Sequence, residues 1–213
     1  MSQLAQRQSM IRAVVFDCDG VLFHSELANL RFYNTVLAGL GLPPLSAEGE
    51  RLAMSMASPQ LIELLFPDPE LRAEVSRAAT NTDYAPFYEW MQPVDGLHDL
   101  LAALRRDYRL GMASNRGKTI YEVAARFDLE QFFEISVGTL DVARPKPHPD
   151  MLLKVLVHLG AQPHEGVFVG DQDSDRLAAE AAGMHFVGIG EESQAQQRIE
   201  HVRDLPSVLA HLG

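Results

Sequence analysis

The chain has 213 residues, 46% of them hydrophobic, and carries 18 Lys and Arg against 29 Asp and Glu, for a formal net charge of −11. This acidic balance, without a basic tract, argues against nonspecific binding to nucleic acid or to an anionic membrane surface. The longest apolar runs fall short of the roughly 20 residues of a membrane span, and the first ten residues lack the apolar centre of a signal peptide. The single cysteine, Cys18, excludes an internal disulfide, so we expect a cytoplasmic protein.

The first predicted element is a buried strand, the apolar run of residues 13–16, which is followed by the sequence DCDG. Asp17 and Asp19 are two residues apart, so on a continuing strand they would face the same way. Two carboxylates brought together repel each other unless something positive lies between them. The plainer interpretation is an Asp-Gly turn, and both interpretations stay open at this point. Cys18 would face the other side as a small buried apolar residue.

The next stretch, residues 24–91, predicts helices only. Apolar residues recur at helical spacing up to Gly41, which stops the pattern. Ser58-Pro59 and Asp68-Pro69 each predict an N-cap followed by proline at the first helical position. We therefore expect an all-helical subdomain inserted after the first strand.

From residue 92 on, strands and helices alternate. Strands are predicted at 108–115, 132–138, 166–171 and 184–190, and helices lie between them and at the end of the chain, at 204–213. Such alternation with brief linkers predicts an α/β fold, in which helices cover both faces of a parallel sheet. The core would comprise residues 10–23 and 92–213, and the helical subdomain residues 24–91.

Polar side chains follow the predicted strands of this core. Each has an ordinary explanation by itself: a turn, a loop, a solvated linker lysine or a helix cap. They are Asp17, Asp19, Ser114, Asn115, Lys146, Asp171 and Asp175. Ligands of open parallel sheets bind beyond the carboxyl ends of the strands, so we expect these groups to meet at one edge.

Together these side chains predict a site for a metal ion and a phosphoryl group. Converging carboxylates require a divalent cation, and oxygen ligands in small number suit Mg²⁺. A hydroxyl, backbone N–H groups and a lysine suit the remaining phosphoryl oxygens. The run DQDSD also resembles the start of a calcium loop, but Arg176 and Ala182 stand where that loop requires glycine and glutamate, so we reject it.

Four motifs in this order resemble the haloacid dehalogenase-like superfamily. They are FDCDGVL (residues 16–22), ASN (113–115), KPHP (146–149) and GDQDSD (170–175). The resemblance covers the whole chain and is greatest to the phosphoglycolate phosphatase and β-phosphoglucomutase branch. It implies a Rossmann-like, doubly wound core with a helical cap inserted after the first motif.

The resemblance also implies the chemistry. Asp17 would be the nucleophile that forms an aspartyl-phosphate, and Asp19 the general acid for the leaving alcohol and then the base for water. Ser114 and the Asn115 amide would hold the transferring phosphoryl group, while Lys146 neutralises it and orients Asp17. Dehalogenases of the superfamily lack the second aspartate, so Asp19 favours a phosphatase.

The same resemblance implies the metal ligands. Asp17, the backbone carbonyl of Asp19 and Asp171 would bind Mg²⁺, with Asp175 supporting the metal shell. We expect a small phosphorylated metabolite as substrate and a monomer or homodimer, with no nucleic-acid or membrane partner.

Substrate specificity is expected in the helical cap, which closes over the site. Candidate residues are Arg51, Met54, Ser55 and Gln60, although structural roles explain them equally well. His24 stands where many relatives carry an aspartate, and we interpret it as a hinge residue.

Two other functions stay open. A phosphomutase would use the same core, but the Ser58-Pro59 pair replaces the Ser-Arg pair of many sugar-phosphate mutases and so disfavours it. A non-catalytic phosphometabolite-binding protein would not need the complete catalytic set. A receiver-type signalling domain fits the helical insertion and the chain length poorly.

Overall fold

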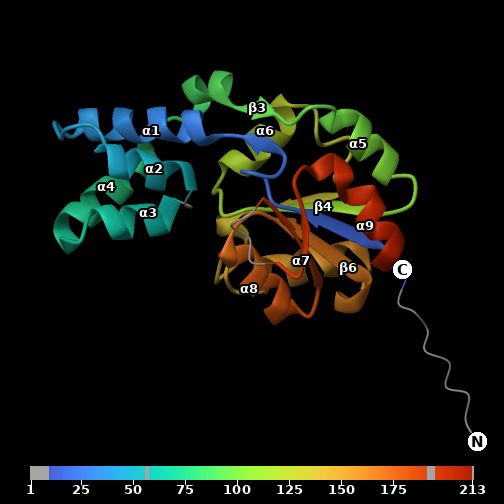
Figure 1. Ribbon diagram of the computed structural model, residues 1–213. Coiled ribbons are helices and arrows are strands. Elements are labelled where there is room, and N and C mark those ends of the chain that lie inside the picture. Colours follow the sequence, from blue (N-terminus) through green and yellow to red (C-terminus); the bar gives the residue numbers. More distant parts are fainter. Residues whose placement is uncertain (1–9, 56–57, 191–194, 213) are drawn as a thin grey trace, which may run out of the picture. The chain divides into compact units, whose positions relative to one another are not determined.

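The computed structural model describes residues 10–55, 58–190 and 195–212, without the side chains of residues 54, 55 and 58–60. The chain divides into two compact units. The core unit comprises residues up to Leu22 and from Val94 on, and the helical unit is Phe23–Pro93 (Figure 1). Among the described residues, helices of the length and apolarity needed to cross a membrane are absent.

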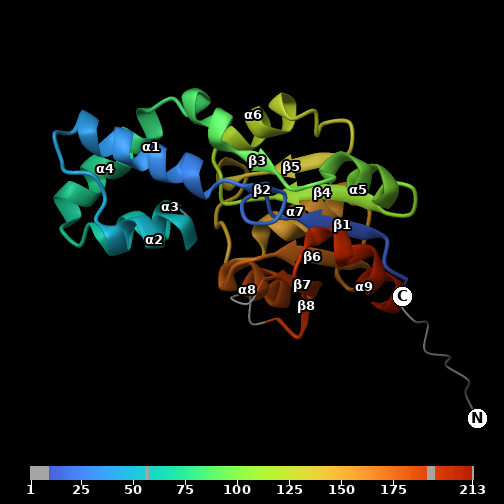
Figure 2. The same cartoon turned by 45° about the horizontal axis from the view of Figure 1, so that its top comes forward.

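The core unit is built on a parallel sheet, as the alternation of strands and helices predicts. Its described strands follow the order β5-β4-β1-β6-β7-β8 (Figure 2). They are β1 (Ala13–Phe16), β4 (Arg109–Ala113), β5 (Ile135–Val137), β6 (Gly166–Gly170), β7 (His185–Ile189) and β8 (Gln197–Ile199). The register places Phe16 of β1 beside Met112 of β4 and Val169 of β6. The three central strands therefore end at nearly the same level, which is what brings their following residues together.

Helices cover both faces of this sheet, with α5 and α6 on one face and α7 and α8 on the other (Figure 1). Their bounds are α5 (Leu97–Leu104), α6 (Thr119–Arg126), α7 (Asp150–Leu159), α8 (Asp173–Ala182) and α9 (Leu205–Leu212). Gly160 and Gly183 adopt positive φ directly after α7 and α8, the backbone conformation in which many helices end.

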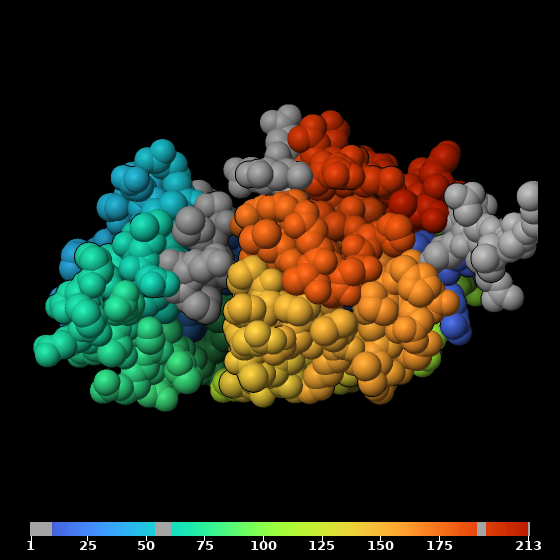
Figure 3. All heavy atoms as spheres, turned by 90° about the horizontal axis from the view of Figure 1, so that it is seen from below, coloured from blue at the N-terminus to red at the C-terminus, as the bar shows by residue number. Residues whose placement is uncertain are grey.

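The face that carries α7 and α8 has a dry apolar core. Val15 and Phe168 from the sheet are fully buried against Val155 of α7 and Ala178 of α8. Each large side chain buried in this way stabilises the fold by roughly 1.5–3 kcal/mol. The outer surface of these helices is seen in Figure 3, where residues 150–182 appear in yellow-orange to orange.

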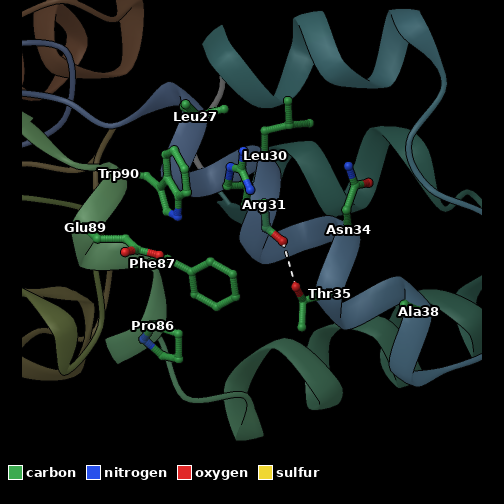
Figure 4. A pocket seen from close by; sticks show the side chains of 10 residues that line it. All are labelled: Leu27, Leu30, Arg31, Asn34, Thr35, Ala38, Pro86, Phe87, Glu89 and Trp90. Atoms are coloured by element: carbon green, nitrogen blue, oxygen red, sulfur yellow. Dashed lines mark hydrogen bonds between the residues drawn. The ribbon is translucent and has the colours of Figure 1, made fainter.

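The helical unit contains α1 (Glu26–Gly39), α2 (Ala47–Ser55), α3 (Ser58–Leu65), α4 (Pro69–Asn81) and a 3₁₀ turn, η1 (Ala85–Trp90). Asp68 caps α4 by accepting a hydrogen bond from the Glu70 N–H, and Pro69 occupies the first turn, as predicted. The aromatic rings of Phe32, Tyr84 and Phe87 pack against one another with centroids 5.2–5.7 Å apart. A groove of about 670 Å³ lies between α1 and η1, where the guanidinium of Arg31 stacks over Trp90 at 3.7 Å (Figure 4).

Four strands differ from the sequence prediction. The strand expected over 132–138 covers only Ile135–Val137, because Phe132 and Phe133 turn into the core before it. β8 was not predicted, since Gln197 and Arg198 are exposed on an edge strand and leave no apolar alternation. The pair β2 (Phe23–His24) and β3 (Gln92–Pro93) is antiparallel and is too short to leave a pattern in the sequence.

Candidate active site

The site lies where β1, β4 and β6 end. Asp17 follows β1 directly, Asp171 follows β6, and Asp175 lies in the first turn of α8. Each of the three offers a carboxylate oxygen, and these oxygens lie within 4.8 Å of one another. The sequence predicts that acids distant along the chain lie together at one sheet edge, and the structure places these three residues in that way.

A tight turn after Asp19 brings the first loop against the third acid. Gly20 has φ +73°, and a Cβ at this position would lie 2.6 Å from Cγ of Asp171. Glycine is therefore required twice, for the backbone conformation and for the close approach. Cys18 between the two aspartates is fully buried, and burial raises its thiol pKa well above its ordinary value. This thiol has the properties of a buried apolar side chain, not of a second nucleophile.

Lys146 supplies the positive charge of the cluster. Its Nζ lies 3.0 Å from Oδ1 of Asp17 and 2.7 Å from Oδ1 of Asp175, and it donates to the carbonyl of Ala113 at 3.2 Å. The side chain is only 2% exposed. Although Lys146 belongs to a proline-rich linker, its side chain is buried and pairs with two acids that are 158 positions apart in the chain.

The loop after β4 fixes that lysine through Asn115. The Asn115 side chain donates from Nδ2 to the Lys146 carbonyl and accepts the Lys146 N–H at Oδ1, both at 3.1 Å. Ser114 is buried beside it, and its Oγ accepts the Arg116 N–H at 3.3 Å. The side chain of Asn115 is therefore committed to the Lys146 backbone, and a phosphate contact by its backbone N–H stays a prediction.

The loop after β6 holds Asp171 and Asp175 in place. The Asp175 carboxylate accepts the N–H groups of Asp171 at 3.2 Å and Gln172 at 3.1 Å, which caps the start of α8. Gln172 donates to Oδ2 of Asp171 at 2.8 Å. Oδ1 of Asp171 is buried and has no hydrogen-bond partner among the described residues. A buried carboxylate oxygen of this kind is expected to bind a cation.

The electrostatics of the cluster favour a further positive charge beside the acids. Burial raises the pKa of Asp17 to about 7, an effect that Lys146 opposes and that Asp175 and Asp19 reinforce. Burial also raises the pKa of Asp171 to about 8, with Asp17 and Asp175 adding to it. Burial opposes the charge of Lys146, but Asp17 and Asp175 outweigh it and raise the lysine pKa. One lysine thus does not neutralise three acids, and the oxygen donors fit a hard divalent cation such as Mg²⁺.

Asp19 is not part of this carboxylate cluster. Its two oxygens accept hydrogen bonds from Arg116, at 2.8 Å from Nε and 2.6 Å from Nη2. A metal contact by the backbone carbonyl of Asp19 stays a prediction. Arg116 was missed in the sequence, although a cation directly after Ser114 and Asn115 at a strand end was a usable signal in a chain with only 18 Lys and Arg.

The candidate specificity residues belong to the helical unit. Arg51 is exposed on α2, and its Nε donates to the carbonyl of Ala47 in the same helix. The side chains of Met54, Ser55 and Gln60 lie outside the described residues. His24 is exposed on β2. Substrate contacts by these residues stay predictions.

Comparison with known proteins decides the family. A family model described as haloacid dehalogenase-like hydrolase matches residues 14–189, which include every motif of the site. The chain belongs to the haloacid dehalogenase-like hydrolases. A solved structure of a subfamily IA hydrolase of this superfamily from Geobacter sulfurreducens is 38% identical, with a TM-score of 0.77 over 94% of this chain and 97% of that one.

Curated relatives place this hydrolase with the phosphatases of the family. A pyrophosphatase PpaX of Bacillus pumilus is 28% identical over 97% of this chain and 98% of the relative. A phosphoglycolate phosphatase of Xanthomonas campestris is 30% identical over 83% of this chain and 81% of the relative. The Rossmann-like core with flanking helices, expected from the motifs, is confirmed by the structural match.

Proposed function

We propose that this hydrolase cleaves a small phosphate monoester in a Mg²⁺-dependent reaction, through an aspartyl-phosphate at Asp17. The observation that carries the proposal is the convergence of Asp17, Asp171 and Asp175 around Lys146 at the ends of β1 and β6. The names of its relatives support phosphorylated metabolites as the substrate class.

The residues present fit a magnesium site. Asp17, Asp171 and the backbone carbonyl of Asp19 would hold the ion, with Asp175 supporting the metal shell, and the buried Oδ1 of Asp171 supports this choice. When bound, the ion would offset the charge of the acids and of the substrate phosphoryl group. The raised pKa values of Asp17 and Asp171 also support this choice, because carboxyl groups buried close together favour a cation beside them.

Asp17 attacks phosphorus, so an Oδ–P bond forms as the bond from phosphorus to the leaving oxygen breaks. Asp19 gives a proton to that leaving oxygen and later takes one from the water that attacks the phosphoenzyme. Lys146 and Ser114 stabilise the charge on the remaining phosphoryl oxygens. The products are the alcohol and inorganic phosphate, and Asp17 is regenerated.

The test compares wild type with Asp17→Asn on p-nitrophenyl phosphate, phosphoglycolate, pyrophosphate and a hexose 1-phosphate, with and without Mg²⁺. Asp173→Asn is the matched control, because Asp173 is an exposed acid of α8 whose side chain pairs with Arg176 outside the cluster. We expect Asp17→Asn to lose at least roughly 10³-fold in kcat and the control to keep near wild-type turnover. Undiminished turnover in Asp17→Asn contradicts the nucleophile assignment, and an isomerised product from a sugar phosphate indicates a mutase.

A further inference from the structure

We propose that Arg116 is a positioning residue that acts through Asp19. The inference rests on the proposed function, because it concerns the group assigned to proton transfer. Nε of Arg116 donates to Oδ2 of Asp19 at 2.8 Å and Nη2 donates to Oδ1 at 2.6 Å. The arginine side chain is 8% exposed and that of the aspartate 31%. This is a bidentate pair with a nearly buried guanidinium, unlike the exposed ion pairs that contribute little.

The backbone around Arg116 is fixed from two directions. Its N–H donates to Ser114 Oγ at 3.3 Å, and its carbonyl accepts the N–H of Thr139 at 2.9 Å. A Cβ on Gly138 would lie 2.7 Å from the Arg116 carbonyl oxygen, so the loops after β4 and β5 are in close contact here. The guanidinium therefore projects from a rigid base and can impose its own orientation on the carboxylate it meets.

Two buried cations hold three of the four acids of the site. Lys146 lies within 3.0 Å of Asp17 and Asp175, and Arg116 holds Asp19. Each Asp19 oxygen accepts a hydrogen bond from a different nitrogen of the planar Arg116 guanidinium, so the carboxylate cannot rotate without losing a hydrogen bond. Arg116 thus keeps the Asp19 carboxylate apart from the metal-binding acids and in one orientation, which is what a proton-transfer group needs.

A double-mutant cycle with Arg116→Met and Asp19→Ala tests this proposal in two readouts. The first is thermal unfolding in EDTA without substrate, which does not depend on the proposed function. We expect Arg116→Met to shift the Tm in the wild-type background but to shift it much less in the Asp19→Ala background. Equal Tm shifts in both backgrounds mean that the two side chains are not coupled, which overturns the proposal.

The second readout is steady-state turnover of an alkyl phosphate with Mg²⁺. We expect Arg116→Met to lower kcat at least about tenfold, with KM changed much less, and to add little further loss to Asp19→Ala. Arg116→Lys keeps the positive charge but cannot form the bidentate pair, so it should recover only part of kcat. An equal loss in both backgrounds, a change in KM alone, or wild-type kcat in Arg116→Met overturns the proposal, and the first two indicate direct substrate contact.

The leaving group separates positioning from general damage. Formation of the phosphoenzyme from p-nitrophenyl phosphate needs little acid assistance, so the initial release of nitrophenol should fall less in Arg116→Met than alkyl phosphate turnover does. Arg109→Gln is the matched control, because Arg109 at the opposite end of β4 also holds a carboxylate, Glu134, in a bidentate pair. We expect this control to keep kcat on both substrates. If the Tm shifts show that Arg116 and Asp19 are coupled but the wild-type protein has no phosphatase activity, the proposed function is refuted, and with it the catalytic part of this inference.

Discussion

The side chain of Asn115 binds the backbone of Lys146 on both its N–H and its carbonyl, as a neighbouring strand would. Lys146 in turn lies within 3.0 Å of both Asp17 and Asp175. A residue at the end of β4 thereby fixes the cation that joins the acids following β1 and β6. The Asn115 side chain is therefore one of the contacts that position the lysine, and its contribution can be measured.

Replacing Asn115 by Ala should lower kcat roughly 10²-fold, because small displacements of a catalytic group are costly even when the chemistry is intact. Asn115→Asp should be no better, since it loses the donor to the Lys146 carbonyl. Steady-state kinetics and Tm measure both effects. Asn34→Ala is the control: Asn34 Oδ1 accepts the Leu45 N–H within the helical unit, so its loss should cost stability of about 1 kcal/mol and little kcat. Equal loss of kcat in both variants would contradict a specific role for Asn115.

Gly20→Ala should remove Mg²⁺-dependent activity, because its Cβ would displace the Asp171 carboxylate. Gly96→Ala separates this clash from backbone strain: Gly96 has φ +72° against +73° for Gly20, but a Cβ there meets no atom of the described residues within 4 Å. Both variants should lose about 1–2 kcal/mol of stability from positive φ. Only Gly20→Ala should also lose Mg²⁺ affinity, measured by titration calorimetry. Wild-type affinity in Gly20→Ala would show that Asp171 does not need this close contact.

Mg²⁺ should stabilise the protein against unfolding. An ion that binds only the folded state adds about 2.7 kcal/mol at a hundredfold excess over its Kd, and chelation with EDTA should reverse the shift in Tm. In Asp171→Asn the shift should be small, because this variant loses the charge of a carboxylate whose buried Oδ1 has no hydrogen-bond partner among the described residues. A Tm shift as large as that of the wild type would show that Asp171 does not bind the ion.

The metal-free protein should lose stability as the pH rises through 7 and 8. Asp17 and Asp171 have folded-state pKa values of about 7 and about 8, raised from 3.8, so between these limits the folded state binds more protons than the unfolded state. Their contribution is therefore fully present below about pH 4 and is lost as the pH passes the folded values. Urea denaturation in EDTA from pH 5 to 9 measures the slope.

The same two carboxyl groups link protons to the metal. Near neutral pH, Mg²⁺ binding should release protons, because the ion binds the ionised carboxylates. Calorimetry in two buffers of different ionisation enthalpy counts the protons released. Asp171→Asn should flatten the pH dependence of stability and reduce proton release. If the pH dependence of stability is unchanged in this variant, Asp171 is not one of the groups that titrate.

The sequence predicted the parts of the site that depend on strand ends. Asp17 and Asp171 follow apolar runs directly, and a parallel sheet leaves such residues at one edge. The pairing of Asp19 with Arg116 was not predictable in this way, because it depends on the conformation of two loops. The hydrogen bonds of the Asn115 side chain were also not predictable, because the sequence alone does not tell whether this amide faces a ligand or the Lys146 backbone. Edge strand β8 was missed because exposed positions carry little pattern.

The Val94 N–H donates to the Leu22 carbonyl at 3.0 Å, although 71 residues, 23 to 93, separate them. The chain therefore leaves the sheet domain and rejoins it at a single point, with its two ends as close as those of a hairpin. A turn of two to five residues is enough to close such a gap. Different insertions could therefore be exchanged at this junction, in engineered chimaeras, without moving the strands that carry the acids.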